Sequence, residues 1–152
     1  MRAVVTRVKN ASVVINEQVN GQIGTGFLVL LGVGPNDTEV TADKLADKIC
    51  NLRVFEDENE KMNLNLEQVG GSLLVVSQFT LYADCRKGRR PSFTDAGNPD
   101  WARPMFDYFV KMVDESCAVS VSSGIFGADM AVRLCNWGPV TIWLDSANLF
   151  AS

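Results

Sequence analysis

Three polar residues, Ser77, Gln78 and Thr80, come directly after an apolar run that is expected to be buried, and Phe79 lies between them. The preceding run, Leu73–Val76, is continuously apolar, which is typical of a central strand. Hydroxyl and amide groups at the end of such a strand must either bond to neighbouring backbone or face a ligand. Both interpretations stay open for this segment when it is taken alone.

A second segment with chemical potential is Asn136–Thr141, which separates two stretches of alternating polar and apolar residues. A Gly138–Pro139 pair in that place usually forms a turn. A cis bond before Pro139 would instead align two successive carbonyl oxygens into a rigid polar wall, which a stereochemical filter needs. Trp137 is interpreted as a packing or partner-contact residue.

The third segment is a cluster of basic residues at Arg86, Lys87, Arg89 and Arg90, followed by Phe93. Such a run is commonly a solvated loop. The chain as a whole has a net charge of −4, so the cluster concentrates positive charge where phosphates can bind and Phe93 can stack on a base. The acidic balance excludes binding of polyanions through overall charge and makes any nucleic-acid contact local.

The sequence contains no histidine, which excludes Ser-His-Asp and Cys-His nucleophile systems and imidazole metal sites. No metal or organic cofactor is expected, because Asp57, Glu58 and Glu60 have no Cys or His nearby and the glycines of 21–26 lack the spacing of a phosphate loop. Four cysteines without a CxxC pair are expected to be free thiols, since the chain shows no export signal. Three of them, Cys50, Cys117 and Cys135, are interpreted as small core residues.

Hydrophobic periodicity places these segments on an alternation of strands and helices. We expect a β-meander over 1–31, a helix capped by Asp37 or Thr38, a central strand over 72–81, a loop over 84–97, a helix starting at Pro99, and strands over 119–121, 128–135 and 140–145. The order predicts one α+β domain over residues 1–152, with a curved, barrel-like sheet and two main helices. No apolar run approaches the ~20 residues of a membrane span, so a soluble, cytoplasmic protein is expected.

Five motifs in this order resemble those of the D-aminoacyl-tRNA deacylase family, also called D-tyrosyl-tRNA deacylases. They are Met62–Asn65, Ser77–Leu81, Arg90–Phe93, Phe126–Met130 and Gly138–Thr141. The similarity extends from Arg7 to Leu144, and Phe79 together with Asn136 resembles the D-specific branch of the family. The resemblance implies an enzyme that hydrolyses the ester between a D-amino acid and tRNA, and that also clears mischarged glycine.

The resemblance further implies a homodimer in which Gly138 and Pro139, joined by a cis bond, enter the partner's pocket and reject L-amino acids. Arg7 resembles the arginine that supports this loop, and Phe126 and Met130 belong to a motif that we expect to support the site. The basic cluster with Phe93 is expected to bind the tRNA. No membrane partner is implied.

Catalysis is expected from Ser77, Gln78, Phe79 and Thr80. The backbone N–H groups of Phe79 and Thr80 would stabilise the oxyanion. The resemblance implies that the 2′-hydroxyl of the terminal adenosine handles the proton. Thr80 as a covalent nucleophile is the alternative, although no general base is evident for it. Two other readings remain: an RNA-binding module without catalysis, and a structural dimer whose Gly-Pro loop only completes the interface.

Overall fold

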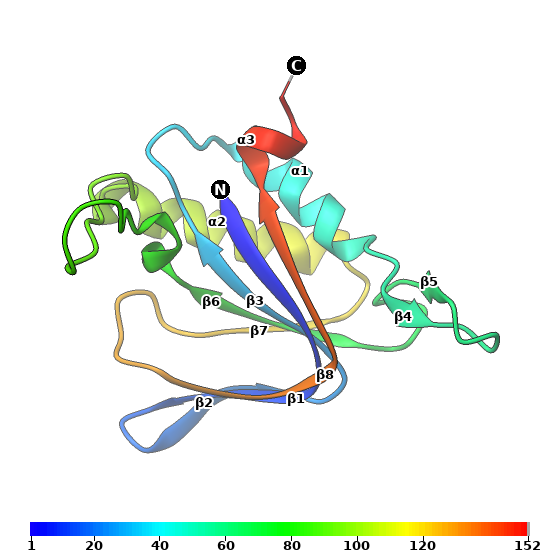
Figure 1. Cartoon of the computed structure of the whole chain (residues 1–152). Helices are drawn as coiled ribbons and strands as arrows, with labels where there is room; N and C mark the ends of the chain where they lie inside the picture. Colours follow the sequence, from blue (N-terminus) through cyan, green and yellow to red (C-terminus); the bar gives the residue numbers. More distant parts are fainter. Residues whose placement is uncertain (152) are drawn as a thin grey trace.

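Six strands form one strongly curved sheet in the computed structural model, which describes residues 1–151 (Figure 1). The strands are β1 (Arg2–Ile15), β2 (Gln18–Ile23), β3 (Gly26–Gly32), β6 (Ser72–Ser77), β7 (Ser120–Ser123) and β8 (Ala131–Asp145). Their order is β2-β1-β3-β6-β7, and β8 pairs with β1. The first half of β1 pairs with β3, its second half with β2, and β8 follows both halves, so the sheet bends around this strand.

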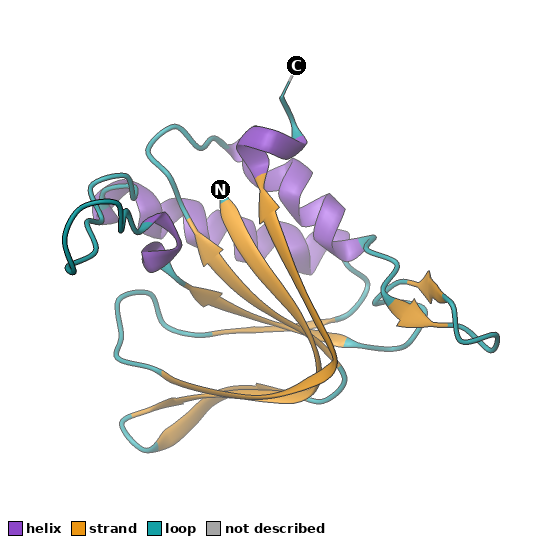
Figure 2. Cartoon of the chain, viewed as in Figure 1, coloured by secondary structure: helices purple, strands orange, loops and turns teal. Residues whose placement is uncertain are grey.

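Two helices lie against one face of the sheet (Figure 2). They are α1 (Glu39–Cys50) and α2 (Pro99–Ser116). Thr38 caps α1 in a reciprocal capping box with Thr41, and Asn98 caps α2 just before Pro99. No helix among the described residues combines the length and apolarity needed to cross a membrane. The predicted α+β fold, with its barrel-like sheet and two main helices, is confirmed.

Parallel pairing in the centre of the sheet sets the position of the predicted catalytic segment. β3 and β6 run parallel with Leu31 opposite Ser77, and the buried run Leu73–Val76 occupies the strand as expected. The strand ends at Ser77, earlier than the predicted position 81, and residues Phe79–Tyr82 form a short 3₁₀ helix, η1. A small hairpin of β4 (Phe55–Glu56) and β5 (Met62–Leu64) and a terminal turn, α3 (Ser146–Leu149), complete the elements.

The segment around Gly138 belongs to one continuous strand, which corrects the prediction of two strands separated by a turn. Thr141 of β8 lies opposite Thr6, and Asn136 lies opposite Val8, so residues 137–140 bulge outward next to Arg7. Pairing with β1 resumes in the same antiparallel direction on both sides of the bulge. The polar interruption in the sequence therefore marks a bulge, not a chain reversal.

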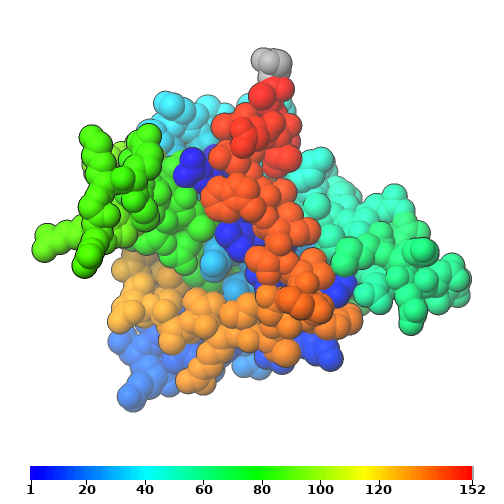
Figure 3. Space-filling view, viewed as in Figure 1, coloured from blue at the N-terminus to red at the C-terminus, as the bar shows by residue number. Residues whose placement is uncertain are grey.

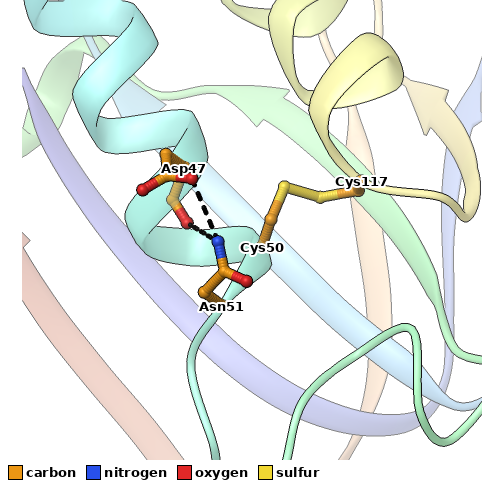
Figure 4. The surroundings of a disulfide bond; sticks show 4 residues. All are labelled: Asp47, Cys50, Asn51 and Cys117. Carbon is orange, nitrogen blue, oxygen red and sulfur yellow. Dashed lines mark hydrogen bonds between the residues drawn. A yellow bond between two sulfur atoms is a disulfide. The ribbon is translucent and has the colours of Figure 1, made fainter.

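A disulfide joins Cys50 to Cys117, which corrects the prediction of four free thiols (Figure 4). Both residues are buried, as expected of core cysteines, but they lie at the ends of α1 and α2, where the packing of the two helices brings their Cα atoms to 5.4 Å. Next to this bond the Asn51 side chain donates to the backbone oxygen of Asp47 at 2.9 Å. Cys135 is exposed, contrary to the prediction, and lies in a stretch of β8 where its neighbours Leu134 and Asn136 are exposed as well.

Candidate active site

A cleft of about 650 Å³ opens where the parallel strands β3 and β6 end. Its walls come from the ends of these two strands, η1, the loop before α2, the first turns of α2 and the segment around Phe126. The principal lining residues are Leu31, Ser77, Gln78, Phe79, Phe93, Ala102, Arg103 and Phe126. The volume suits a nucleoside-sized ligand, and the carboxyl ends of parallel strands are common places for binding sites.

The start of η1 presents two backbone donors. Among residues 1–151, neither the N–H of Phe79 nor that of Thr80 has a hydrogen-bond partner, whereas the N–H of Gln78 bonds to the oxygen of Leu31 at 2.8 Å. The first N–H groups of a helical turn are left free by the geometry of the turn itself. Two adjacent free N–H groups beside a cleft can stabilise an oxyanion.

The hydroxyl group of Thr80 is held by its neighbour. The Gln78 amide Nε2 donates a short hydrogen bond to Thr80 Oγ1. Thr80 does not line the cleft, although Ser77, Gln78 and Phe79 do. No basic side chain is bonded to this hydroxyl in the described part of the chain, so the arrangement contains no group that would activate it as a nucleophile.

An aromatic pair connects the predicted catalytic segment with the basic loop. The rings of Phe79 and Phe93 meet edge to face with centroids 5.1 Å apart, and both are exposed in the cleft. Reciprocal backbone hydrogen bonds between Asp84 and Ser92 close the base of this loop at 2.7 and 2.9 Å. Phe93 therefore extends the cleft with a flat apolar surface next to η1.

The loop that contains the four basic residues projects away from the body of the protein (Figure 3), and all four residues are exposed. Arg86 is bound by Asp84, with Nη2 2.7 Å from Oδ2, and this guanidinium holds the pKa of the Asp84 carboxyl low, at about 2. No carboxylate among residues 1–151 forms an ion pair with Lys87, Arg89 or Arg90. Their charges therefore remain available to an anionic partner.

The Gly138–Pro139 bulge is exposed and lies outside the cleft of its own chain. The bond between the two residues is cis. Asn136 braces the bulge, since its Oδ1 accepts from the N–H of Val140 at 3.2 Å and its Nδ2 donates to Thr141 Oγ1 at 3.0 Å.

Arg7 supports the bulge from beneath. Its side chain is only 3% exposed, its Nε donates to the oxygen of Trp137 at 3.0 Å, and its Nη1 donates to the oxygen of Val54 at 2.7 Å. The guanidinium also lies 4.5 Å from the centre of the Trp137 ring. A fork of donors engaged on two carbonyls fixes the bulge relative to the sheet.

The two remaining predicted residues, Phe126 and Met130, lie in different parts of the structure. Phe126 lines the cleft, and its ring centroid lies 6.0 Å from that of Phe106 in α2. Met130 lines a different pocket beside Asp129 and packs near Gly124 on the smaller core. The structure thus brings Ser77, Gln78, Phe79, Phe93 and Phe126 together and leaves Met130, Gly138 and Pro139 elsewhere on the same chain.

Two arginines next to these elements were not predicted. Arg2 links the end of η1 to β8, because its Nη1 donates to the oxygen of Leu81 at 3.0 Å and its Nε contacts Asp145 at 3.3 Å. It also stacks on Tyr82, whose pKa is raised by burial. Arg103 lines the cleft on α2. Helical periodicity places Arg103 on the polar side of α2, but it does not indicate which cleft that side borders.

An α+β domain with this curved sheet and this cleft is a known class of fold. The solved structure of a c-Myc DNA unwinding element binding protein superimposes with a TM-score of 0.90 and 38% identity, covering 95% of this chain and 98% of the other. A probable eukaryotic D-amino acid tRNA deacylase shares the fold with a TM-score of 0.79 at 19% identity, covering 94% and 97% of the two chains.

Sequence relatives define the family more narrowly. The profile of the family described as D-Tyr-tRNA(Tyr) deacylase matches residues 4–145. The D-aminoacyl-tRNA deacylase of Desulfovibrio desulfuricans is 59% identical over the full length of both chains, and that of Clostridioides difficile is 55% identical over 99% of this chain and 100% of its own. This chain therefore belongs to the D-Tyr-tRNA(Tyr) deacylase family, a family of hydrolases, and the resemblance inferred from the five motifs is confirmed.

Proposed function

We propose that this enzyme hydrolyses the ester that joins a D-amino acid to the terminal adenosine of tRNA, releasing the free D-amino acid and reusable tRNA. The observation that carries the proposal is the pair of free N–H groups at Phe79 and Thr80, placed beside an aromatic cleft of nucleoside size. Family relatives named for this activity support the same conclusion. We place the reaction in the cytoplasm, where charged tRNA is used.

The reaction needs a positioned water, an oxyanion site and a proton carrier. Water attacks the ester carbonyl carbon, and the developing oxyanion accepts hydrogen bonds from the N–H groups of Phe79 and Thr80, each worth roughly 3–4 kcal/mol in other hydrolases. The bond to the ribose 3′-oxygen then breaks, and that oxygen takes up a proton. Because the sequence has no histidine, the 2′-hydroxyl of the same ribose relays this proton.

Selection between mirror-image substrates is assigned to the Gly138–Pro139 bulge of a second copy of the chain. The bulge is exposed, rigidly supported by Arg7 and absent from its own cleft, so it is suited to completing a partner's cleft in a homodimer. Its carbonyls would accept from the substrate ammonium group and leave no volume for an L side chain. A D side chain points to solvent and glycine has none, so D-aminoacyl and glycyl esters are both accepted.

Binding of the tRNA body is assigned to the projecting loop. Lys87, Arg89 and Arg90 supply charges without carboxylate partners, Arg86 is partly occupied by Asp84, and Phe93 offers a stacking surface. The acidic remainder of the protein keeps this contact local.

The proposed function is tested by incubating the purified protein with the same tRNA charged with D-tyrosine or with L-tyrosine. We expect rapid hydrolysis of the D-ester and survival of the L-ester, because only the L side chain meets the bulge. Binding of both tRNAs without cleavage of either would instead identify a non-catalytic RNA-binding protein. Equal cleavage of both esters would contradict the selection of D-esters by the Gly138–Pro139 bulge.

Replacing Thr80 by Ala is expected to keep the single-turnover rate within about tenfold of the natural protein, because the oxyanion donor is the backbone N–H and not the hydroxyl. Thr94→Ala, which removes another hydroxyl from the cleft lining, serves as the matched control. A loss of about 10³-fold or more in a folded Thr80→Ala protein, with the control unaffected, would establish the covalent route.

A further inference from the structure

We infer that Arg103 binds a phosphate of the substrate's RNA backbone, at the wall that α2 contributes to the cleft. The inference rests on the proposed function and adds to it a phosphate subsite inside the cleft, separate from the projecting basic loop.

Among the described residues that line this cleft, Arg103 has the one ionisable side chain. It lies on the first turns of α2 and is exposed, and the centre of its guanidinium stands 5.1 Å from the ring of Phe126, which lines the same cleft. Stacking on an aromatic ring holds the planar guanidinium while its N–H groups remain free to bond at the edge. A single positioned guanidinium in an otherwise uncharged cleft favours a ligand with one anionic group there.

Neighbouring groups leave the charge of Arg103 uncompensated. Within residues 1–151, no carboxylate lies within 4.0 Å of its nitrogen atoms. The start of α2 does not offer an alternative anion site, because Pro99 has no N–H, the N–H of Asp100 bonds to Asn98 Oδ1 at 2.9 Å, and that of Trp101 bonds to the oxygen of Asn98 at 2.9 Å. The guanidinium is therefore the charged donor that this wall presents to a ligand, next to the neutral side-chain amide of Asn98.

The chemistry of the substrate matches this separation of groups. An aminoacylated terminal adenosine has its ester on the 3′ side of the ribose and its phosphate on the 5′ side. In the inferred binding mode the ester carbon lies at the N–H groups of Phe79 and Thr80, and the 5′-phosphate lies at Arg103 on the α2 wall of the same cleft. Lys87, Arg89 and Arg90 stand on the projecting loop, so they are left to contact phosphates farther along the RNA.

The test compares two substrates that differ in phosphate. One is D-tyrosyl-adenosine, which has none, and the other is the D-tyrosyl CCA trinucleotide, whose adenosine carries a 5′-phosphodiester. We expect Arg103→Gln to lower kcat/KM for the trinucleotide by about tenfold, through KM, while leaving D-tyrosyl-adenosine within about twofold. Arg103→Lys, which keeps the charge, restores part of the loss.

Direct binding tests the contact independently of cleavage. CCA trinucleotide without an attached amino acid should bind Arg103→Gln about tenfold more weakly than it binds the natural protein. The slope of log affinity against log salt concentration should also become shallower by about 0.7, the value for one phosphate contact on a single strand. Lys111→Gln, the same charge change on the outer face of α2, is the matched control and should change neither quantity.

Three outcomes separate the two proposals. An equal loss for both substrates, or no loss of trinucleotide binding, overturns the phosphate contact and leaves the deacylase function standing. Absence of D-ester cleavage by the natural protein overturns the proposed function, while the binding measurement still decides whether Arg103 contacts the phosphate. A loss confined to the phosphate-bearing ligands supports the inference.

Discussion

D-tyrosyl-tRNA whose terminal adenosine lacks the 2′-hydroxyl is expected to be hydrolysed about 10²–10⁴-fold more slowly than the natural substrate, the usual contribution of general acid–base catalysis. The reason lies in what surrounds the ester. The sequence has no histidine, no carboxylate among residues 1–151 lines the cleft, and the hydroxyl of Thr80 accepts a hydrogen bond from Gln78. In the proposed mechanism the substrate's own 2′-hydroxyl therefore carries the proton.

Single-turnover hydrolysis of the two tRNAs at saturating enzyme measures this effect, and competition against the natural substrate shows whether the deoxy tRNA still binds. A tRNA with the deoxy sugar at the preceding nucleotide is the control, because it loses a hydroxyl without touching the ester. If the natural tRNA and the tRNA with the 2′-deoxy terminal adenosine were hydrolysed at rates within about threefold of each other, substrate assistance would be contradicted. A group of the protein would then have to transfer the proton.

Local signals in the sequence predicted both helices and the buried part of the central strand, although not where that strand ends. Thr38 and Asn98 each cap the helix that follows, because their side-chain oxygens satisfy backbone N–H groups that the helix leaves free. The apolar run Leu73–Val76 predicts a strand that is buried on both faces, as parallel pairing between β3 and β7 requires.

Contacts between distant segments could not be predicted in the same way. Cys50 and Cys117 are 67 residues apart, and only the packing of α1 on α2 brings them into bonding distance. The course of β8 through the bulge depends on β1, which pairs with it on both sides of Arg7. Neither the spacing of cysteines nor the Gly-Pro pair contains this information.

The candidate site shows the same division. Ser77 to Thr80 stand out by polarity, and the motifs assign Phe93 to tRNA binding and Phe126 to support of the site. The cleft places both aromatic residues beside Ser77, Gln78 and Phe79, a proximity that the sequence alone does not predict. Arg103 belongs to none of the five family motifs. It is one of several charged residues on the polar side of α2, and only the position of Phe126 shows that it borders the cleft.

Gly138→Ala is expected to lower kcat/KM for D-tyrosyl-tRNA by about 10²-fold, the effect of displacing a positioning element by about 1 Å, and to narrow the preference for the D-ester. Gly138 has a φ of +129°, which side-chain-bearing residues rarely adopt. A Cβ atom there would stand 2.8 Å from Val140 Cγ2 and 2.9 Å from Arg7 Nη2. Arg7 cannot withdraw without breaking its bonds to Trp137 and Val54, so the bulge itself must move.

Gly24→Ala is the matched control, because an added Cβ at this position meets no atom within 4 Å. It should leave the hydrolysis rates of D-tyrosyl-tRNA and L-tyrosyl-tRNA unchanged. Rates for D- and L-tyrosyl-tRNA, measured on variants whose circular dichroism matches the natural protein, give the comparison. An unaltered D-to-L ratio in folded Gly138→Ala would show that the bulge does not select the substrate.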